Sequence, residues 1–203
     1  YKNLTLASSF NAEQLNITGK YKDSIAGRLF HYLQFSVNWG SQVQKAVQYI
    51  NPHFAQTFLV RYRTVINDYN ASQLLASGSL YFPGIGINHS LVLSGAFQAR
   101  DTADQYRFSN NFPFARGYNS VDAPRMWKGS ANYHFPLFYP DWGFAQLVYF
   151  SRIRANLFFD YAQAKDLPTG DVFLFRSTGT EIFFDTKWWN QQAVSFGIRY
   201  SRL

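Results

Sequence analysis

The sequence predicts an all-β protein, an antiparallel transmembrane β-barrel that is present in part. Ten stretches alternate apolar and polar residues, as a strand does when successive side chains point to opposite faces. Aromatic residues make up 20% of the chain, yet the mean hydropathy is only −0.24. That pairing is typical of a membrane barrel, in which aromatic girdles mark both interfaces and half of each strand is polar. No run approaches the roughly 18 apolar residues that a transmembrane helix needs, which excludes a helical membrane protein.

The clearest alternation runs over residues 152–161. Leu157 and Phe159 fall on the apolar face of this stretch, whereas Arg154 and Asp160 fall on its polar face. Most of the alternating stretches are longer than a usual globular strand, and about 9–11 tilted residues suffice to cross a bilayer. The ten expected strands are residues 2–10, 13–22, 28–39, 54–66, 71–82, 86–99, 127–136, 146–162, 173–187 and 192–202.

Long cationic side chains recur on the polar faces of these stretches. A cation costs little where its face lines water and costs much more where it packs in a core. The pattern therefore favours strands whose polar faces surround a wet interior. The residues concerned are Arg61, Arg63, Lys128, Arg152, Arg154 and Arg199.

The connections between the expected strands differ in length. Residues 83–86 form a tight turn, as Pro and Gly favour, and residues 187–191 form another short link. The stretch 41–52 has apolar residues at helical spacing, and it is either a short helix capped by Ser41 or a misread strand. Residues 101–126 are long and have no strand pattern, and loops of this length are usually functional or disordered.

Composition and motifs argue against catalysis and against nucleic-acid binding. The chain has no cysteine, which removes disulfides, thiol catalysis and thiolate metal sites. Its four histidines show no metal-binding spacing, and no nucleophile elbow or phosphate loop is present. We therefore expect no enzyme activity, no metal and no cofactor. The formal charge is +7, but the basic residues are scattered, so nucleic acid is not an expected partner.

Two motifs carry a resemblance to a known family. The long loop contains Phe114-Ala115-Arg116-Gly117-Tyr118, and Phe158-Phe159-Asp160-Tyr161-Ala162 ends a later strand, with one expected strand between them. This order resembles the superfamily of outer-membrane assembly and secretion barrels typified by BamA, TamA and the two-partner secretion transporters. Their signature is an R-G-[FY] tripeptide at the tip of a loop that folds into the barrel, and an F-x-D-x-G motif on the next strand but one. The resemblance covers residues 86–203, and Ala162 stands where the family usually has glycine.

The resemblance implies that the loop at 101–126 folds into the lumen and that Arg116 pairs there with Asp160. A charge-assisted pair of arginine and carboxylate is strong and directional, so it suits a loop that must be fixed in place. His134 stands where the family often has a second acid, and Glu181 on the following strand can take that role. The expected site residues are Arg116, Gly117 and Tyr118 in the loop, with Asp160, Phe158 and Glu181 as their lumen partners and Arg152 and Arg154 as basic residues of the lumen wall.

The family barrel has sixteen strands, so the resemblance implies that residues 1–203 are one partial barrel domain, about ten of the sixteen strands and a fragment of a longer chain. It further implies a location in the bacterial outer membrane and a function in inserting or exporting polypeptides. The expected partners are outer-membrane lipid, client polypeptides and periplasmic or lipoprotein accessory subunits.

Two other functions remain open from the sequence. The first is a passive pore, or a barrel that anchors another domain in the membrane. The second is a soluble β-sandwich that acts as a binding module, in which the apolar strand faces meet a second sheet. The surroundings of Leu157, Phe159 and Asp160 distinguish a sandwich from a barrel, because only in a sandwich are Leu157 and Phe159 covered by protein.

Overall fold

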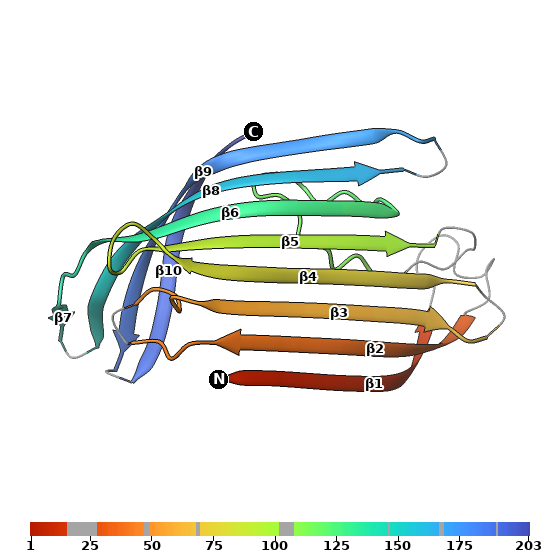
Figure 1. The fold of residues 1–203 in the computed structure, drawn as a ribbon, viewed down its shortest axis with the longest axis horizontal. Coiled ribbons are helices and arrows are strands. Elements are labelled where there is room, and N and C mark those ends of the chain that lie inside the picture. The colour runs from red at the N-terminus through yellow and green to blue at the C-terminus, as the bar shows by residue number, and fades with distance from the viewer. Residues whose placement is uncertain are drawn as a thin grey trace.

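The chain folds into one antiparallel β-sheet (Figure 1). The computed structural model describes residues 1–15, 28–46, 49–67, 70–101, 108–145, 147–166, 169–189 and 191–203. Within these ranges there is no helix long and apolar enough to cross a membrane. The strands are β1 (Lys2–Leu15), β2 (Arg28–Gln42), β3 (Ala55–Val65), β4 (Ser72–Pro83), β5 (Ser90–Arg100), β6 (Arg125–Phe138), β7 (Trp142–Phe144), β8 (Val148–Lys165), β9 (Val172–Trp188) and β10 (Gln192–Arg202).

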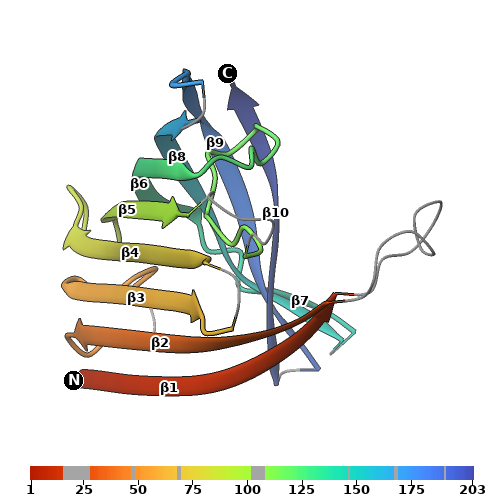
Figure 2. The same ribbon diagram turned by 90° about the vertical axis from the view of Figure 1, so that its right-hand side faces the viewer.

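Nine strands form a meander in the order β1-β2-β3-β4-β5-β6-β8-β9-β10, and the tenth, the short β7, pairs with β8 beside this path. Each long strand is antiparallel to the next, as short connections allow. In the described part of the chain β1 and β10 are both edges with a single neighbour, so the sheet is not closed. Figure 2 shows that the sheet is curved, with residues 108–124 on its inner, concave side.

The two faces of the sheet differ in polarity, as the alternation predicts. The outer, convex face exposes large apolar side chains, among them Leu157 at 48%, Phe159 at 50% and Ile198 at 68% exposure. The concave face carries polar side chains beside an apolar area under the loop, and Asp160 on that face is completely buried beneath residues 108–124. Among the described residues no second sheet covers either face, which is not the arrangement of a β-sandwich.

Two predicted strand boundaries are wrong. Residues 2–10 and 13–22 were expected as separate strands, but β1 continues from Lys2 to Leu15 because each of its residues pairs with β2, and this ladder outweighs the local polarity near Asn11. Residues 16–22 lie outside the described part of the chain. The strand expected from residue 86 begins only at Ser90, because the His89 N–H donates to the Gly86 carbonyl at 3.0 Å and closes a turn.

The stretch 41–52 is not a helix in its described residues. Residues 41–42 end β2, residues 43–46 and 49–52 are irregular, and residues 47–48 lie outside the described part. Tertiary contacts hold this connection: the Val43 N–H donates to the Phe54 carbonyl at 2.9 Å, and the Asn51 side chain donates to Ser90 Oγ at 2.8 Å. The sequence also gave no sign of β7, which has only three residues.

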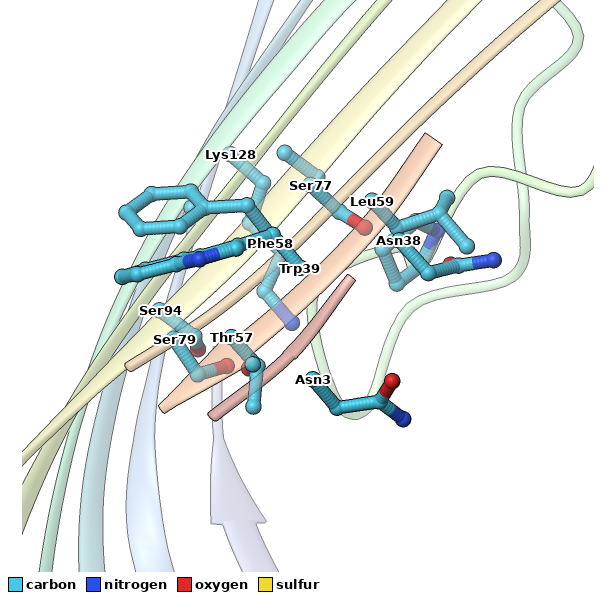
Figure 3. A pocket seen from close by; sticks show the side chains of 15 residues that line it. Asn3, Asn38, Trp39, Thr57, Phe58, Leu59, Ser77, Ser79, Ser94 and Lys128 are labelled. Atoms are coloured by element: carbon cyan, nitrogen blue, oxygen red, sulfur yellow. The ribbon is translucent and has the colours of Figure 1, made fainter. Parts of the chain in front are cut away.

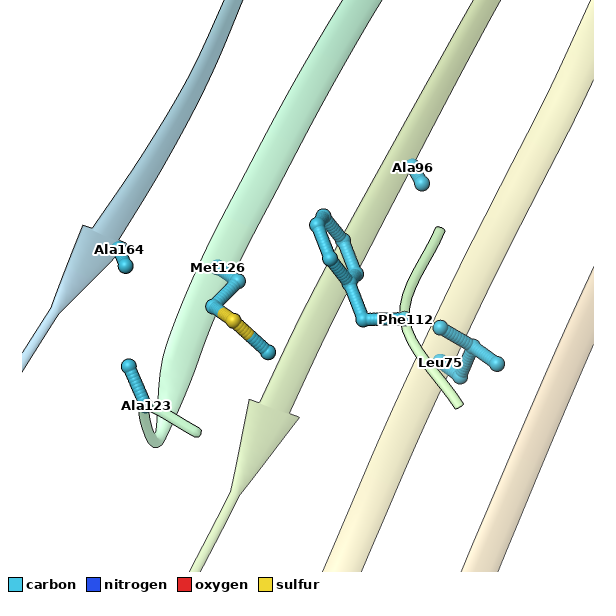
Figure 4. Close-up of a cluster of buried hydrophobic side chains, with 6 residues drawn as sticks. All are labelled: Leu75, Ala96, Phe112, Ala123, Met126 and Ala164. Carbon is cyan, nitrogen blue, oxygen red and sulfur yellow. The ribbon is translucent and has the colours of Figure 1, made fainter. Parts of the chain in front are cut away.

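The long loop packs against the concave face through apolar side chains. Phe112 of the loop lies over β4 and β5, and Ala123 approaches Met126 at the start of β6 (Figure 4). These contacts remove Met126 almost completely from solvent and fix the loop across four strands. The buried cluster consists of Leu75, Ala96, Phe112, Ala123, Met126 and Ala164.

Candidate functional site: a loop arginine on the concave face

Arg116 is held by Asp160 of β8 through three hydrogen bonds. Its guanidinium binds both carboxylate oxygens, from Nε to Oδ2 at 2.9 Å and from Nη2 to Oδ1 at 2.7 Å. Its backbone N–H donates to Oδ2 as well, at 2.9 Å. The contact that the resemblance implied is therefore present, in the two-pronged geometry that makes arginine–carboxylate pairs strong. Because Asp160 is fully buried, this carboxylate depends on protein donors rather than on water.

Glu181 of β9 is a second acidic partner of the loop. Its Oε2 lies 3.3 Å from Nη1 of Arg116, and the Asn156 amide donates to the same oxygen at 2.8 Å. Its other oxygen, Oε1, accepts a hydrogen bond at 2.5 Å from Arg199 of the edge strand β10. One carboxylate thus connects the loop to the edge of the sheet, and the expected pairing of Glu181 with Arg116 is present.

Phe158 forms a platform for the arginine. The Cζ atom of Arg116 lies 3.8 Å from the centre of the Phe158 ring, a cation–π contact. The ring in turn lies over Gly179 of β9, where an added Cβ would come within 2.8 Å of it. Glycine at this position therefore lets the ring lie close to the sheet, and the arginine stacks on top.

Three polar residues of β6 complete the network, and the site motifs did not include them. Ser130 donates to Asp160 Oδ1 at 2.7 Å, and Asn132 accepts from Nη2 of Arg116 at 2.7 Å. Lys128 Nζ lies 3.5 Å from Asp160 Oδ2 and donates to the Phe114 carbonyl at 3.0 Å. Their signal in the sequence was their place on the polar face of the expected strand 127–136, but only the register that pairs Ser130 with Asp160 brings them to the site.

Gly117 and Tyr118 fix the tip of the loop against the neighbouring strands. Gly117 has a φ of +85°, a left-handed conformation that costs other residues energy, and an added Cβ would come within 2.7 Å of Ser201 Oγ. The Tyr118 hydroxyl donates to the Arg176 carbonyl of β9 at 2.9 Å, and its ring packs edge-on against Phe175. The loop tip therefore contacts both β9 and β10.

Gly117→Ala is expected to weaken the packing of the loop tip on β9 and β10 by about 1–3 kcal/mol. The left-handed backbone becomes strained, and the new methyl group meets β10. Gly170 is a matched control, because it has a similar φ of +75° but no atom within 4 Å of an added Cβ. Gly170→Ala adds backbone strain alone. Limited proteolysis of the loop measures the difference, and equal cleavage rates in the two variants would contradict the contact.

Arg100, which the sequence did not mark as a site residue, holds the base of the loop. Arg100 at the end of β5 donates to the carbonyls of Phe108 at 3.1 Å and of Ala123 at 2.9 Å. It also forms an ion pair with Asp122. One guanidinium thereby joins both ends of the 108–124 segment. Backbone carbonyls have no sequence signature, so this role of Arg100 was not recognisable from motifs.

Arg152 and Arg154, expected as basic residues of the lumen wall, lie on the concave face but away from Arg116. Both pair with Asp185 of β9, at 2.7 and 3.2 Å, near the opposite end of β8 from Asp160. The structure thus separates the predicted residues into two groups. We call the first, which contains Arg116, the loop site.

The loop site is a network of ion pairs and hydrogen bonds that positions the loop. Its carboxylates are occupied by cations and amides, and the described residues include no group of three His, Cys, Asp or Glu side chains that could hold a metal ion. Beside it, a cavity of about 530 Å³ lies between Pro113 of the loop and β1 to β6. In Figure 3, Trp39 and Phe58 stack on one side of the strands, while Asn38, Leu59 and Ser77 point to the other, towards the cavity.

No known protein family, no curated protein and no solved structure matches this chain. The geometry of the chain itself therefore carries the functional argument.

Proposed function

We propose that this chain is part of a transmembrane β-barrel of the bacterial outer membrane that inserts or exports polypeptides, as in the superfamily typified by BamA. The observation that carries the proposal is the position of Arg116, which extends from a loop and forms ion pairs with Asp160 and Glu181 on the concave face. The resemblance suggested this contact from two separated motifs, and the bidentate geometry makes the pair strong and directional.

The outer face of the sheet supports a membrane location. It exposes apolar side chains over all of its long strands, including Leu6, Phe35, Phe97 and Phe196. Soluble monomers rarely expose contiguous apolar patches larger than a few hundred Å². Lipid chains would cover such a face, and the concave face would then enclose water and the loop.

The free edges of the sheet fit a barrel that further strands complete. In hydrocarbon, unpaired N–H and C=O groups cost several kcal/mol each, so spanning sheets close upon themselves. The backbones of β1 and β10 have only one neighbouring strand each in the described sheet. We infer that additional strands, up to the sixteen of the family, pair with these edges.

In this barrel the loop site would act as a plug and a coupling element. The loop fills part of the interior, and Glu181 connects Arg116 to Arg199 on β10. Movement of β10 would therefore displace Glu181 and weaken its contact with the loop. Release of the loop would likewise remove one partner of Glu181 and make β10 more mobile. Such a device can gate a polypeptide path without any covalent step.

Proteoliposomes that contain the full-length protein test this proposal. They are expected to speed the insertion of an unfolded barrel client into the bilayer, or to admit a secreted client to the interior, relative to liposomes that carry a passive porin. Protease protection of the client measures both outcomes. A protein that conducts ions steadily but changes neither rate would be a passive pore or an anchor, and the proposal would be wrong.

A further inference from the structure

A second cavity, of about 670 Å³, lies on the concave face at the end opposite to the loop site. Lys45, Ile50 and Asn51 border it on one side, and Tyr139 and residues of β8, β9 and β10 form the rest of its wall. Four of its lining residues carry positive charge, whereas Asp185 is its one acidic residue in the described part of the chain. We call this space the basic cavity, and its cations are Lys45, Arg152, Arg154 and Lys187.

Asp185 organises the two arginines and leaves the cavity positive. Arg152 donates through Nε at 2.8 Å to Oδ2, and Arg154 donates through Nε at 3.2 Å to the same carboxylate. Ser195 of β10 donates to Oδ1 at 2.7 Å and fixes the carboxylate from the other side. Arg154 also lies over the Phe183 ring, at 4.2 Å. A carboxylate bound in this way holds two guanidinium groups rigidly, as an oxyanion site requires.

A β-bulge lies at the border of the basic cavity, next to Arg152. The pairing of β8 with β9 shifts between Phe150 and Arg152, so that Ser151 is the additional residue. The Ser151 hydroxyl donates to the Asp185 carbonyl at 2.8 Å and stabilises the bulge. Bulges often re-aim side chains beside functional sites. Arg152 lies directly opposite Asp185 in the unbroken register that precedes the bulge along β9, with Arg154 on the same face.

Lys45 adds a cation from a different part of the chain. It lies in the 43–54 connection, where its ammonium group donates to the Ile50 carbonyl at 2.7 Å. Burial and the repulsion of Arg152 and Arg154 lower the pKa of Lys45, and the attraction of Asp185 opposes this only in part. The fold thus gathers like charges at an energetic cost that a bound anion would relieve.

We propose that the basic cavity binds an acidic segment of a polypeptide through its aspartate or glutamate side chains. This inference rests on the proposed function, because it assigns to the polypeptide path a site that prefers one charge. The cavity is much larger than one carboxylate, and Ile50, Asn51 and Tyr139 give it apolar and amide surface for a peptide backbone. Lipid headgroups are a poorer fit, because the cavity opens on the concave face and the apolar side chains cover the other.

Binding of a fluorescent peptide of alternating Asp and Ser to the full-length protein in nanodiscs tests the site, with fluorescence anisotropy as the readout. We expect Arg154→Gln and Lys45→Gln each to weaken binding about tenfold, the value of one charged hydrogen bond. Arg61→Gln is the matched control, because Arg61 is a concave-face arginine outside the cavity, and its affinity is expected to stay unchanged. The Asn–Ser analogue of the peptide is expected not to bind.

Three outcomes would overturn the proposal: equal affinity for the two peptides, equal losses in Arg61→Gln and Arg154→Gln, or inhibition of peptide binding by vesicles of an anionic lipid but not by free acidic peptide. Direct binding of inorganic phosphate, measured by calorimetry, with no affinity for the peptide would identify a small-anion site instead and would also contradict the proposal. Client insertion by proteoliposomes is measured separately. A protein that inserts clients but does not bind the peptide would disprove this inference and leave the proposed function intact.

Discussion

Arg116→Ala is expected to release residues 108–124 from the concave face. The substitution leaves the buried carboxylate of Asp160 without its main partner, and breaking a buried ion pair from one side costs about 3–5 kcal/mol. Lys128, at 3.5 Å, can compensate only in part. Local opening of the loop should therefore become about 10²–10³-fold more frequent. Protease cleavage within the loop, in the folded protein, measures that change directly.

Arg116→Lys separates charge from geometry. Lysine keeps the positive charge but lacks the planar fork that binds both oxygens of Asp160 and stacks on Phe158. We therefore expect Arg116→Lys to recover less than half of the lost protection. Complete recovery would mean that the site needs only a charge, and the proposed role of the bidentate contact would be wrong.

A double-mutant cycle shows whether Arg116 and Asp160 act as one unit. If they do, Arg116→Ala and Asp160→Ala each impair client insertion, and the double variant is no worse than either. Strictly additive losses of client insertion would mean that the two residues act independently, and the proposed role of their pairing would be wrong. Arg61→Ala is a suitable control, because it removes a concave-face arginine outside the loop site and is expected to add independently.

The sequence predicted the strands well because their side chains separate two environments. The alternation in residues 152–161 places Leu157 outward and Asp160 inward, and the structure has both. Two strands were predicted on either side of Asn11, where the structure has one strand because pairing with β2 continues. In a sheet, the neighbouring strand determines where a strand ends, and no single stretch of sequence contains that information.

The residues of the loop site that belong to a distinctive motif were predictable from the sequence. Those that reach the site only through the pairing register of neighbouring strands were not. Arg116 and Asp160 were found because each belongs to a recognisable tripeptide or pentapeptide. Ser130 and Asn132 reach them only through the pairing of β6 with β8, and Arg100 contacts mostly carbonyl groups. The bulge at Ser151, which lies beside the basic cavity, likewise has no pattern in the sequence.

Leu157→Arg is expected to reduce folding stability in a bilayer by about 2–4 kcal/mol, the cost of an arginine on the lipid face of a barrel near the midplane. Leu157 is already 48% exposed, so in water the same change would cost little. Ser94→Arg is the matched control, because Ser94 lines the 530 Å³ cavity on the concave face. We expect the control to fold with nearly unchanged stability, since its new charge would face water.

Because the chain has no cysteine, the contact of individual side chains with lipid can be tested residue by residue. Single cysteines in β2 can carry an environment-sensitive dye in protein reconstituted with brominated lipid. Phe35 and Val37 lie on the convex face, whereas Ser36 and Asn38, which alternate with them, lie on the concave face. Strong quenching at 35 and 37 with weak quenching at 36 and 38 is the expected result, because only alternate side chains reach the lipid. Equal quenching at all four positions would mean that lipid does not cover one face of this sheet, and the proposal of a membrane barrel would be wrong.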